Sequence, residues 1–193
     1  MRYLLLLVLF TTQMWAAKPT QAQLDAAERK LYPAAWETYT NAKGAAMATY
    51  VLATHTIIDA EGFEAHSYGD IYQRSIGNGL RVGLTFVKND KITKVESRSV
   101  VKALVVLIDG RLSKMEGYSV LKPLARAQLI SMYFNCPKLV GPKCKKYMKA
   151  GNVDLLSREV NFGHKKGQNS DRRLAEANKI RLSYKLKALK TAY

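Results

Sequence analysis

Histidines, cysteines and long apolar runs are scarce in this chain of 193 residues. No apolar run approaches the roughly 20 residues that a membrane-spanning helix needs, so we expect no transmembrane span in the mature chain. The two cysteines, at their spacing, lack partners for a zinc site, and the sequence contains neither a His-Glu-x-x-His nor a Gly-x-Ser-x-Gly motif. The sequence therefore predicts no metal and no cofactor.

Acidic residues are also scarce, since 15 Asp and Glu stand against 31 Lys and Arg, a formal net charge of +16. Residues 1–90 hold 8 basic and 8 acidic side chains, residues 91–141 hold 9 and 3, and residues 142–193 hold 14 and 4. This one-sided excess predicts a positive face in the second half that attracts nucleic acid, anionic lipid, an acidic cell-wall polymer or an acidic protein. The alternative is that the charge serves solubility alone.

The N-terminus has the order of a secretory signal peptide. Arg2 precedes an apolar run from Leu4 to Phe10, and small residues follow up to Ala17. We expect removal of residues 1–17, or cleavage as late as Ala22, which leaves a single domain over 18–193 in the periplasm or outside the cell. An uncleaved N-terminal anchor is the alternative.

Cys136 and Cys144 flank a short segment that contains two prolines and a glycine. Because an exported chain enters an oxidising compartment, the sequence predicts a disulfide that closes this loop and stabilises the protein by about 2–3 kcal/mol. The spacing differs from Cys-x-x-Cys, so a redox role is not indicated.

The hydrophobic periodicity predicts an α+β fold with N-terminal helices packed on an antiparallel sheet. Residues 20–60 show helical spacing that ends at Gly62, and 68–120 have the pattern of strands, with a hairpin turn at Asp109-Gly110. Pro123 marks the start of another helix.

The C-terminal part is predicted as a basic helix and strand segment. Residues 152–162 favour a strand, and 180–187 alternate between apolar and basic side chains, as a strand with one basic face does. An edge strand whose lysines discourage aggregation is the alternative reading of this tail.

The stretch from His55 to His66 is the main candidate for catalytic chemistry. His55 and Asp59 would lie one helical turn apart, which lets a carboxylate orient a histidine base, and His66 would supply an acid. His164, beside two lysines, could join them in ribonuclease-like cleavage. The alternatives are a metal held by His55, His66 and a carboxylate, and an ordinary helix end with solvated acids.

Together these features favour an exported, non-enzymatic binding protein whose basic half holds an acidic protein or an anionic polymer. It would be an inhibitor, an immunity-type protein or a component of an envelope complex. The alternative is an exported, nuclease-like hydrolase that uses the histidines. The residues expected to contact the partner are Lys143, Lys145, Lys146, Lys149, Arg172, Arg173, Arg181, Lys185 and Lys187.

Overall fold

The computed structural model describes residues 33–69, 74–81, 91–162 and 169–191. Over these residues the fold is mostly helical with a small antiparallel sheet, which confirms the α+β class. Among the described helices we find none with the length and apolarity of a membrane span. The predicted signal peptide lies outside the described residues.

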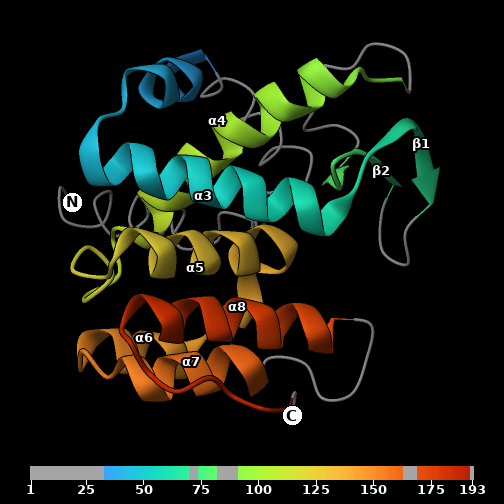
Figure 1. The fold of residues 1–193 in the computed structure, drawn as a ribbon. Helices are drawn as coiled ribbons and strands as arrows, with labels where there is room; N and C mark the ends of the chain where they lie inside the picture. The colour runs from blue at the N-terminus through green and yellow to red at the C-terminus, as the bar shows by residue number, and fades with distance from the viewer. Residues whose placement is uncertain (1–32, 70–73, 82–90, 163–168, 192–193) are drawn as a thin grey trace, which may run out of the picture.

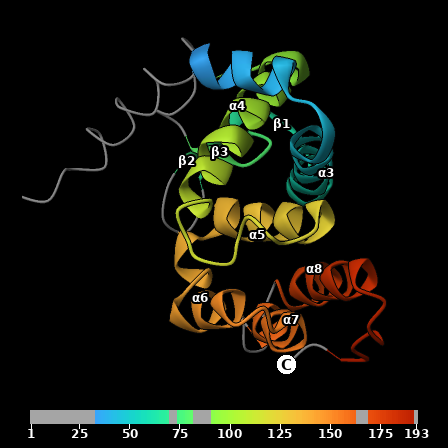
Figure 2. The ribbon, with the colours of Figure 1, turned by 90° about the vertical axis from the view of Figure 1, so that its left-hand side faces the viewer.

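Helix α5 (Pro123–Asn135) forms the middle layer of the molecule (Figure 1). It begins at Pro123, as predicted, because proline at the first helical position loses no hydrogen bond. Above it lie α3 (Gly44–Glu61) and α4 (Lys94–Leu112). Below it lie α6 (Pro142–Lys149), α7 (Val153–Phe162) and α8 (Ser170–Ser183), an arrangement that Figure 2 shows from the side.

The core follows from this layering. Ala125, Ala127, Leu129 and Ile130 of α5 are all fully buried, because the helix is covered from both sides. A short 3-10 helix, η1 (Pro137–Leu139), then connects α5 to the lower layer. The middle helix therefore ties the upper and lower layers into one hydrophobic core.

A three-stranded sheet lies at the C-terminal end of α3 (Figure 1). Its strands are β1 (Glu64–Gly69), β2 (Arg74–Gly77) and β3 (Leu80–Arg81), paired antiparallel in that order. Gly62 ends α3 with a φ of 65°, a conformation that glycine adopts readily. The helix end and the start of the sheet are thus separated by two residues.

The sheet predicted over 68–120 is wrong for its second half. Residues 94–112 form α4, which a capping box opens: Thr93 N–H donates to Glu96 Oε2 at 2.8 Å, and Glu96 N–H donates to Thr93 Oγ1 at 3.2 Å. The β-branched run at 103–108 lies within this helix, and Asp109-Gly110 is not a hairpin turn. Burial of a helical stripe outweighs the intrinsic strand preference of these residues.

The two strands predicted in the C-terminal part are also wrong. Residues 152–162 lie in and just before α7, and α8 continues through Ser183 into the alternating stretch. Of the alternating apolar residues, Ile180 is fully buried while Leu182 is 70% exposed. The alternation therefore does not mark one apolar face.

The predicted disulfide is wrong as well, because Cys136 and Cys144 are both free. Cys144 lies in the first turn of α6, fully buried, and its thiol donates to the Leu139 carbonyl oxygen at 3.6 Å. Burial raises the pKa of the Cys144 thiol to about 12. This cysteine is a neutral core residue, whereas Cys136 caps the end of α5.

Candidate active site

Glu61, the last residue of α3, lies where the upper helices, the sheet and α8 meet. Its side chain is only 18% exposed, and its Oε1 accepts a hydrogen bond from Arg172 Nη1 of α8 at 2.6 Å. No described residue hydrogen-bonds its other oxygen, Oε2. Glu61 is thus a half-buried carboxylate with one oxygen hydrogen-bonded and the other without a hydrogen-bond partner among the described residues.

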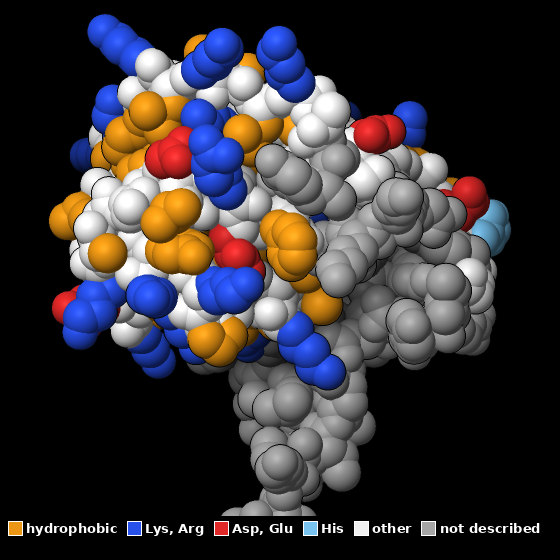
Figure 3. All heavy atoms as spheres, turned by 90° about the horizontal axis from the view of Figure 1, so that it is seen from below, with side chains coloured by type: hydrophobic (Ala, Val, Ile, Leu, Met, Phe, Trp, Pro, Cys, Tyr) orange, Lys and Arg blue, Asp and Glu red, His pale blue; other side chains and the backbone are white. Residues whose placement is uncertain are grey.

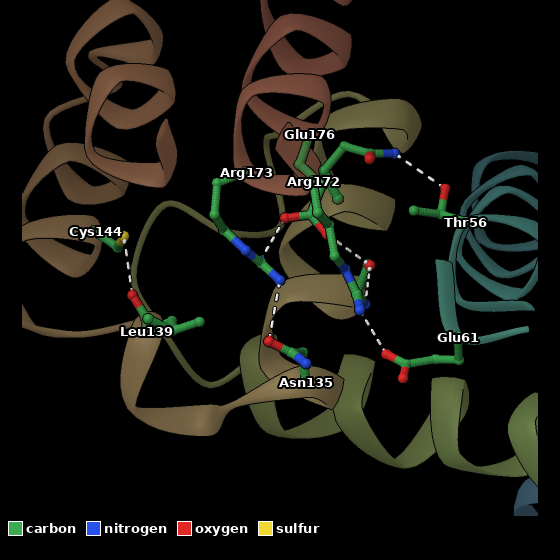
Figure 4. A network of polar contacts seen from close by, with 10 residues as sticks. Thr56, Glu61, Asn135, Leu139, Cys144, Arg172, Arg173 and Glu176 are labelled. Carbon is green, nitrogen blue, oxygen red and sulfur yellow. Dashed lines mark hydrogen bonds and ion pairs between the residues drawn. The ribbon is translucent and has the colours of Figure 1, made fainter. Parts of the chain in front are cut away.

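Arg172 is held by three partners from three helices (Figure 4). Besides Glu61, its Nε donates to Glu176 Oε1 at 3.3 Å, and its Nη2 donates to Ser131 Oγ of α5 at 3.2 Å. The Ser131 hydroxyl in turn donates to Glu176 Oε1 at 2.8 Å. The guanidinium is therefore fixed in the orientation that meets Glu61.

A second ion pair stands behind Arg172. Arg173 is fully buried and pairs with Glu176, and its Nη2 donates to Asn135 Oδ1 at 3.2 Å. Burial raises the pKa of Glu176 and lowers the pKa of Arg173, so desolvation opposes both charges and the ion pair offsets this cost. Two arginines and Ser131 surround Glu176, which makes it a support for Arg172.

The turn between β2 and β3 covers the other side of Glu61. A Cβ atom on Gly79, whose φ is +67°, would approach Glu61 Oε2 to 2.6 Å. The neighbouring Asn78 is fixed to α4, since its N–H donates to Ser97 Oγ at 2.9 Å and the Ser97 hydroxyl donates to Asn78 Oδ1 at 2.7 Å. The Asn78 amide also donates to the Gly62 carbonyl oxygen. Glu61 is thus enclosed by a fixed glycine turn and a fixed arginine.

A polar pair from α3 and α5 lies near this network (Figure 4). Gln128 is fully buried, and its amide donates to Thr56 Oγ1 at 3.4 Å. Its Oε1 has no hydrogen-bond partner among the described residues. A buried acceptor without a partner is uncommon, and this one is closed to solvent between α3 and α5.

The histidine cluster of the sequence analysis does not assemble in the described structure. His55 and Asp59 are exposed on α3, and no hydrogen bond or ion pair joins these two described residues. His66 is exposed on β1, where it bridges to Lys91 through the backbone. His164 lies outside the described residues.

Sequence reasoning did not single out Glu61, and its only related alternative was an ordinary helix end with solvated acids. The signal was present in the spacing of Tyr50, Ala53 and Ile57, the buried stripe of α3, which continues at Glu61. A carboxylate at the end of an inward-facing stripe needs a buried partner. That partner, Arg172, is 111 residues away and cannot be found by local pattern.

The predicted basic contact residues fall into two groups. Arg172, Arg173 and Arg181 are engaged within the chain: Arg181 Nη1, for instance, contacts Asp154 Oδ1 at 2.5 Å and Ser157 Oγ at 3.0 Å. The hydrogen bonds that Asp154 accepts from Arg181 and Arg158 lower its pKa. The exposed group comprises Lys143, Lys145, Lys146 and Lys149 on α6 and Lys185 and Lys187 after α8.

No family model and no curated protein matches this sequence. Solved structures do match. A mutant of the phage P22 lysozyme, 17% identical, superposes with a TM-score of 0.55 over 66% of this chain and 94% of that one. The active form of the phage P1 endolysin Lyz, 14% identical, superposes with a TM-score of 0.61 over 81% of this chain and 94% of that one. The chain has the fold of these phage enzymes.

This likeness contradicts our expectation of a non-enzymatic binding protein. Both solved neighbours are enzymes, a lysozyme and an endolysin, and the hydrolase that we set out as the alternative agrees with them better. One fold can carry many activities, so the likeness gives the fold and the chemistry of the site must identify the function.

Proposed function

We propose that this protein is a lysozyme-like glycoside hydrolase that cleaves cell-wall glycan, with Glu61 as its general acid. The observation that carries the proposal is the setting of Glu61: half-buried, fixed through Oε1 by Arg172, and with Oε2 free of hydrogen bonds from the described residues. The lysozyme and endolysin folds of the solved neighbours support the same reading.

The chemistry requires a carboxylic acid that protonates the leaving oxygen of the glycosidic bond. Arg172 fixes one oxygen of Glu61, so Oε2 is the atom that would carry and deliver the proton. Gly79 presents no side chain to this oxygen, where a Cβ atom would lie only 2.6 Å away, so the turn sits close to Oε2 without a group that competes for its proton.

Glycoside hydrolysis also uses a second carboxylate, as base or nucleophile. Glu176 is unsuited to this role, because Arg172, Arg173 and Ser131 already occupy it. The next two acidic residues after Glu61 in the sequence are Glu64, at the start of β1, and Asp70, which lies outside the described residues. Replacing each by its amide identifies which of them acts.

A cell-wall hydrolase must reach the wall, so export is part of this proposal. The N-terminal order of Arg2, an apolar run and small residues up to Ala17 supports it. Sequencing the N-terminus of the protein recovered from the envelope fraction tests whether residues 1–17 are removed.

The direct test compares Glu61→Gln with Asp59→Asn on purified sacculi. We expect Glu61→Gln to lower the release of reducing ends by roughly 10²- to 10⁴-fold, the range that a general acid contributes. Asp59, an exposed acid on the same helix, is the matched control and should retain activity. Full activity of Glu61→Gln would reject the proposal.

The same preparations decide against the nuclease-like alternative. We expect labelled RNA and duplex DNA to stay intact and His55→Ala, His66→Ala and His164→Ala to keep glycan cleavage. Cleaved nucleic acid that depends on any histidine would favour that alternative instead.

A further inference from the structure

A hollow of about 460 Å³ lies between α6 and the segment that connects α4 to α5. Lys114 and Glu116 line one side, and Lys145, Lys146 and Lys149 line the other. None of these residues takes part in the network around Glu61. The hollow is therefore separate from the Glu61 site, and glycan cleavage does not account for it.

The two walls of this hollow are held together by backbone contact. A Cβ atom on Gly117, whose φ is +83°, would lie 2.0 Å from the Met148 carbonyl oxygen of α6, so only glycine fits. The next residue, Tyr118, is fully buried, and its hydroxyl donates to Asp109 Oδ1 at 2.7 Å. The hollow is therefore preformed, and its lysines are not needed to hold it.

The lining is strongly positive. Four ammonium groups and one carboxylate give it a net charge of +3, and the carboxylate of Glu116 pairs with Lys149 at 2.9 Å. Lys114, Lys145 and Lys146 have no carboxylate within 4.0 Å among the described residues. Figure 3, which views the molecule from the side of α6 and α7, shows many more Lys and Arg than Asp and Glu side chains. Clustered like charges destabilise a protein unless an anion joins them.

We propose that this hollow binds phosphate groups of an anionic polymer of the cell envelope. Lysine ammonium groups suit phosphate oxygens as point-charge donors, and the two walls can reach a phosphate from opposite sides. Among the described residues that line the hollow none is aromatic, so this lining lacks the stacking surface that nucleic-acid bases use. A polyol-phosphate chain, which carries phosphates without bases, fits this lining.

Such a site keeps the protein at the wall while the Glu61 site works, because tethering raises the effective concentration of the glycan. The binding rests on the hollow alone and does not require hydrolysis. The experiment therefore uses the full chain with Glu61→Gln in every variant, so that the wall is not cut. Its probes are sacculi that carry covalently attached poly(glycerol phosphate) and the same sacculi stripped of phosphodiesters with hydrofluoric acid.

We expect the parent to pellet with phosphate-bearing sacculi roughly tenfold more strongly than with stripped sacculi at low salt, with the difference reduced as salt rises. Lys145→Glu/Lys146→Glu should lose this difference, and Lys114→Glu on the opposite wall should weaken it. Lys43→Glu/Lys179→Glu, which changes two exposed lysines elsewhere by the same charge, is the matched control and should behave like the parent.

Equal loss in the control pair would mean that net charge, not the hollow, causes retention, and would overturn the proposal. Retention that Lys145→Glu/Lys146→Glu leaves unchanged, or that stripping leaves unchanged, would overturn it too. Circular dichroism of each variant verifies the fold. All variants share Glu61→Gln, and reducing ends in the supernatant report whether the wall is cut, so failure of this proposal is distinguishable from failure of the Glu61 proposal.

Discussion

Glu61 at the end of α3 and Arg172 in the first turn of α8 form a 2.6 Å ion pair across 111 positions of sequence. The pair joins the upper and lower layers at the edge of the sheet. Its arginine is braced by Glu176 and Ser131, so the orientation of Glu61 is set by residues of α5 and α8 as well as by its own helix. Activity and stability should therefore both respond when this arginine changes.

Arg172→Gln should lower glycan cleavage by roughly tenfold to hundredfold, because a misplaced acid transfers its proton poorly. It should also cost about 1–3 kcal/mol of unfolding free energy, since Glu61 and Ser131 lose a charged partner. The loss should fall on kcat more than on KM, which distinguishes positioning from substrate binding. Arg172→Lys should recover only part of it, as one ammonium group cannot reach three acceptors.

The matched control is Lys143→Gln, which removes an ion pair outside the hollow whose side chains are 65% and 24% exposed. We expect at most about 1 kcal/mol and no change in kcat. If Arg172→Gln behaved like this control in urea unfolding and turnover, the ion pair would have no role in orienting Glu61.

Gly79→Ala tests the other wall of the site. The residue has a φ of +67°, which alanine disfavours, and the new methyl group would lie 2.6 Å from Glu61 Oε2. We expect about 1–2 kcal/mol of destabilisation and a marked loss of cleavage, as the acid must move.

Gly110→Ala is the counterpart within α4, where an added Cβ meets nothing within 4 Å. Alanine should stabilise the helix there by about 0.5–1 kcal/mol and leave cleavage unchanged. Thermal unfolding and reducing-end assays on both variants separate a general glycine effect from one on Glu61. Wild-type cleavage by Gly79→Ala would show that the turn does not confine Glu61.

The sequence predicted those helices whose signals are local. Gly62 ends α3, and Pro123 opens α5, because each acts on its own backbone. The run at 103–108 was misassigned because its β-branched content favours a strand, while the Thr93 capping box and burial against α3 and α5 make it a helix. The packing of one helix layer on another cannot be predicted from a short stretch of sequence.

The candidate site was harder to predict for the same reason. His55 and Asp59 are close in sequence and were predicted to form a catalytic pair, yet both are exposed. Glu61 is recognisable as a site residue only from its contacts with Arg172 and Gly79, which come from two other parts of the chain. Polar residues that cluster in the sequence indicate sites formed by neighbouring residues, whereas this site is assembled by tertiary contacts.

Asp109 is a buried hub whose removal should cost more than any surface charge. It is 6% exposed and accepts hydrogen bonds from the Tyr118 hydroxyl at 2.7 Å and from Arg126 Nη2 at 2.9 Å. Burial and the nearby carboxylate raise the pKa of Tyr118. Asp109→Asn leaves Arg126 without its counter-charge, so we expect about 3–5 kcal/mol of destabilisation in urea.

Tyr118→Phe removes a single hydrogen bond from this hub and should cost less, about 1–3 kcal/mol. Should the two substitutions cost the same, the Arg126 ion pair would contribute nothing beyond the tyrosine hydrogen bond. Both substitutions lie outside the Glu61 network, so the cleavage rate of the folded fraction should stay near that of the parent.

Cys144 should make the stability of the protein depend on pH, because its thiol is free and can lose a proton when the chain unfolds. Burial raises the pKa of this thiol from 9.0 to about 12, so the folded chain keeps the proton between these values while the unfolded chain releases it. Because the folded state then binds more protons, stability should fall as pH rises above about 9. Cys144→Ala should be less stable overall through its small cavity, yet its unfolding free energy should decline less between pH 8 and pH 10.

Thiol labelling supplies an independent measurement on the same residue. At pH 8 a disulfide-exchange reagent should modify the partly exposed Cys136 of the native chain promptly and reach Cys144 only after denaturant is added, because the buried thiol stays neutral. Equal labelling rates for both native thiols, or a pH slope that Cys144→Ala leaves unchanged, would place Cys144 in a more open environment than α6 provides. Either result would argue against the close packing of the lower layer, on which the position of Arg172 depends.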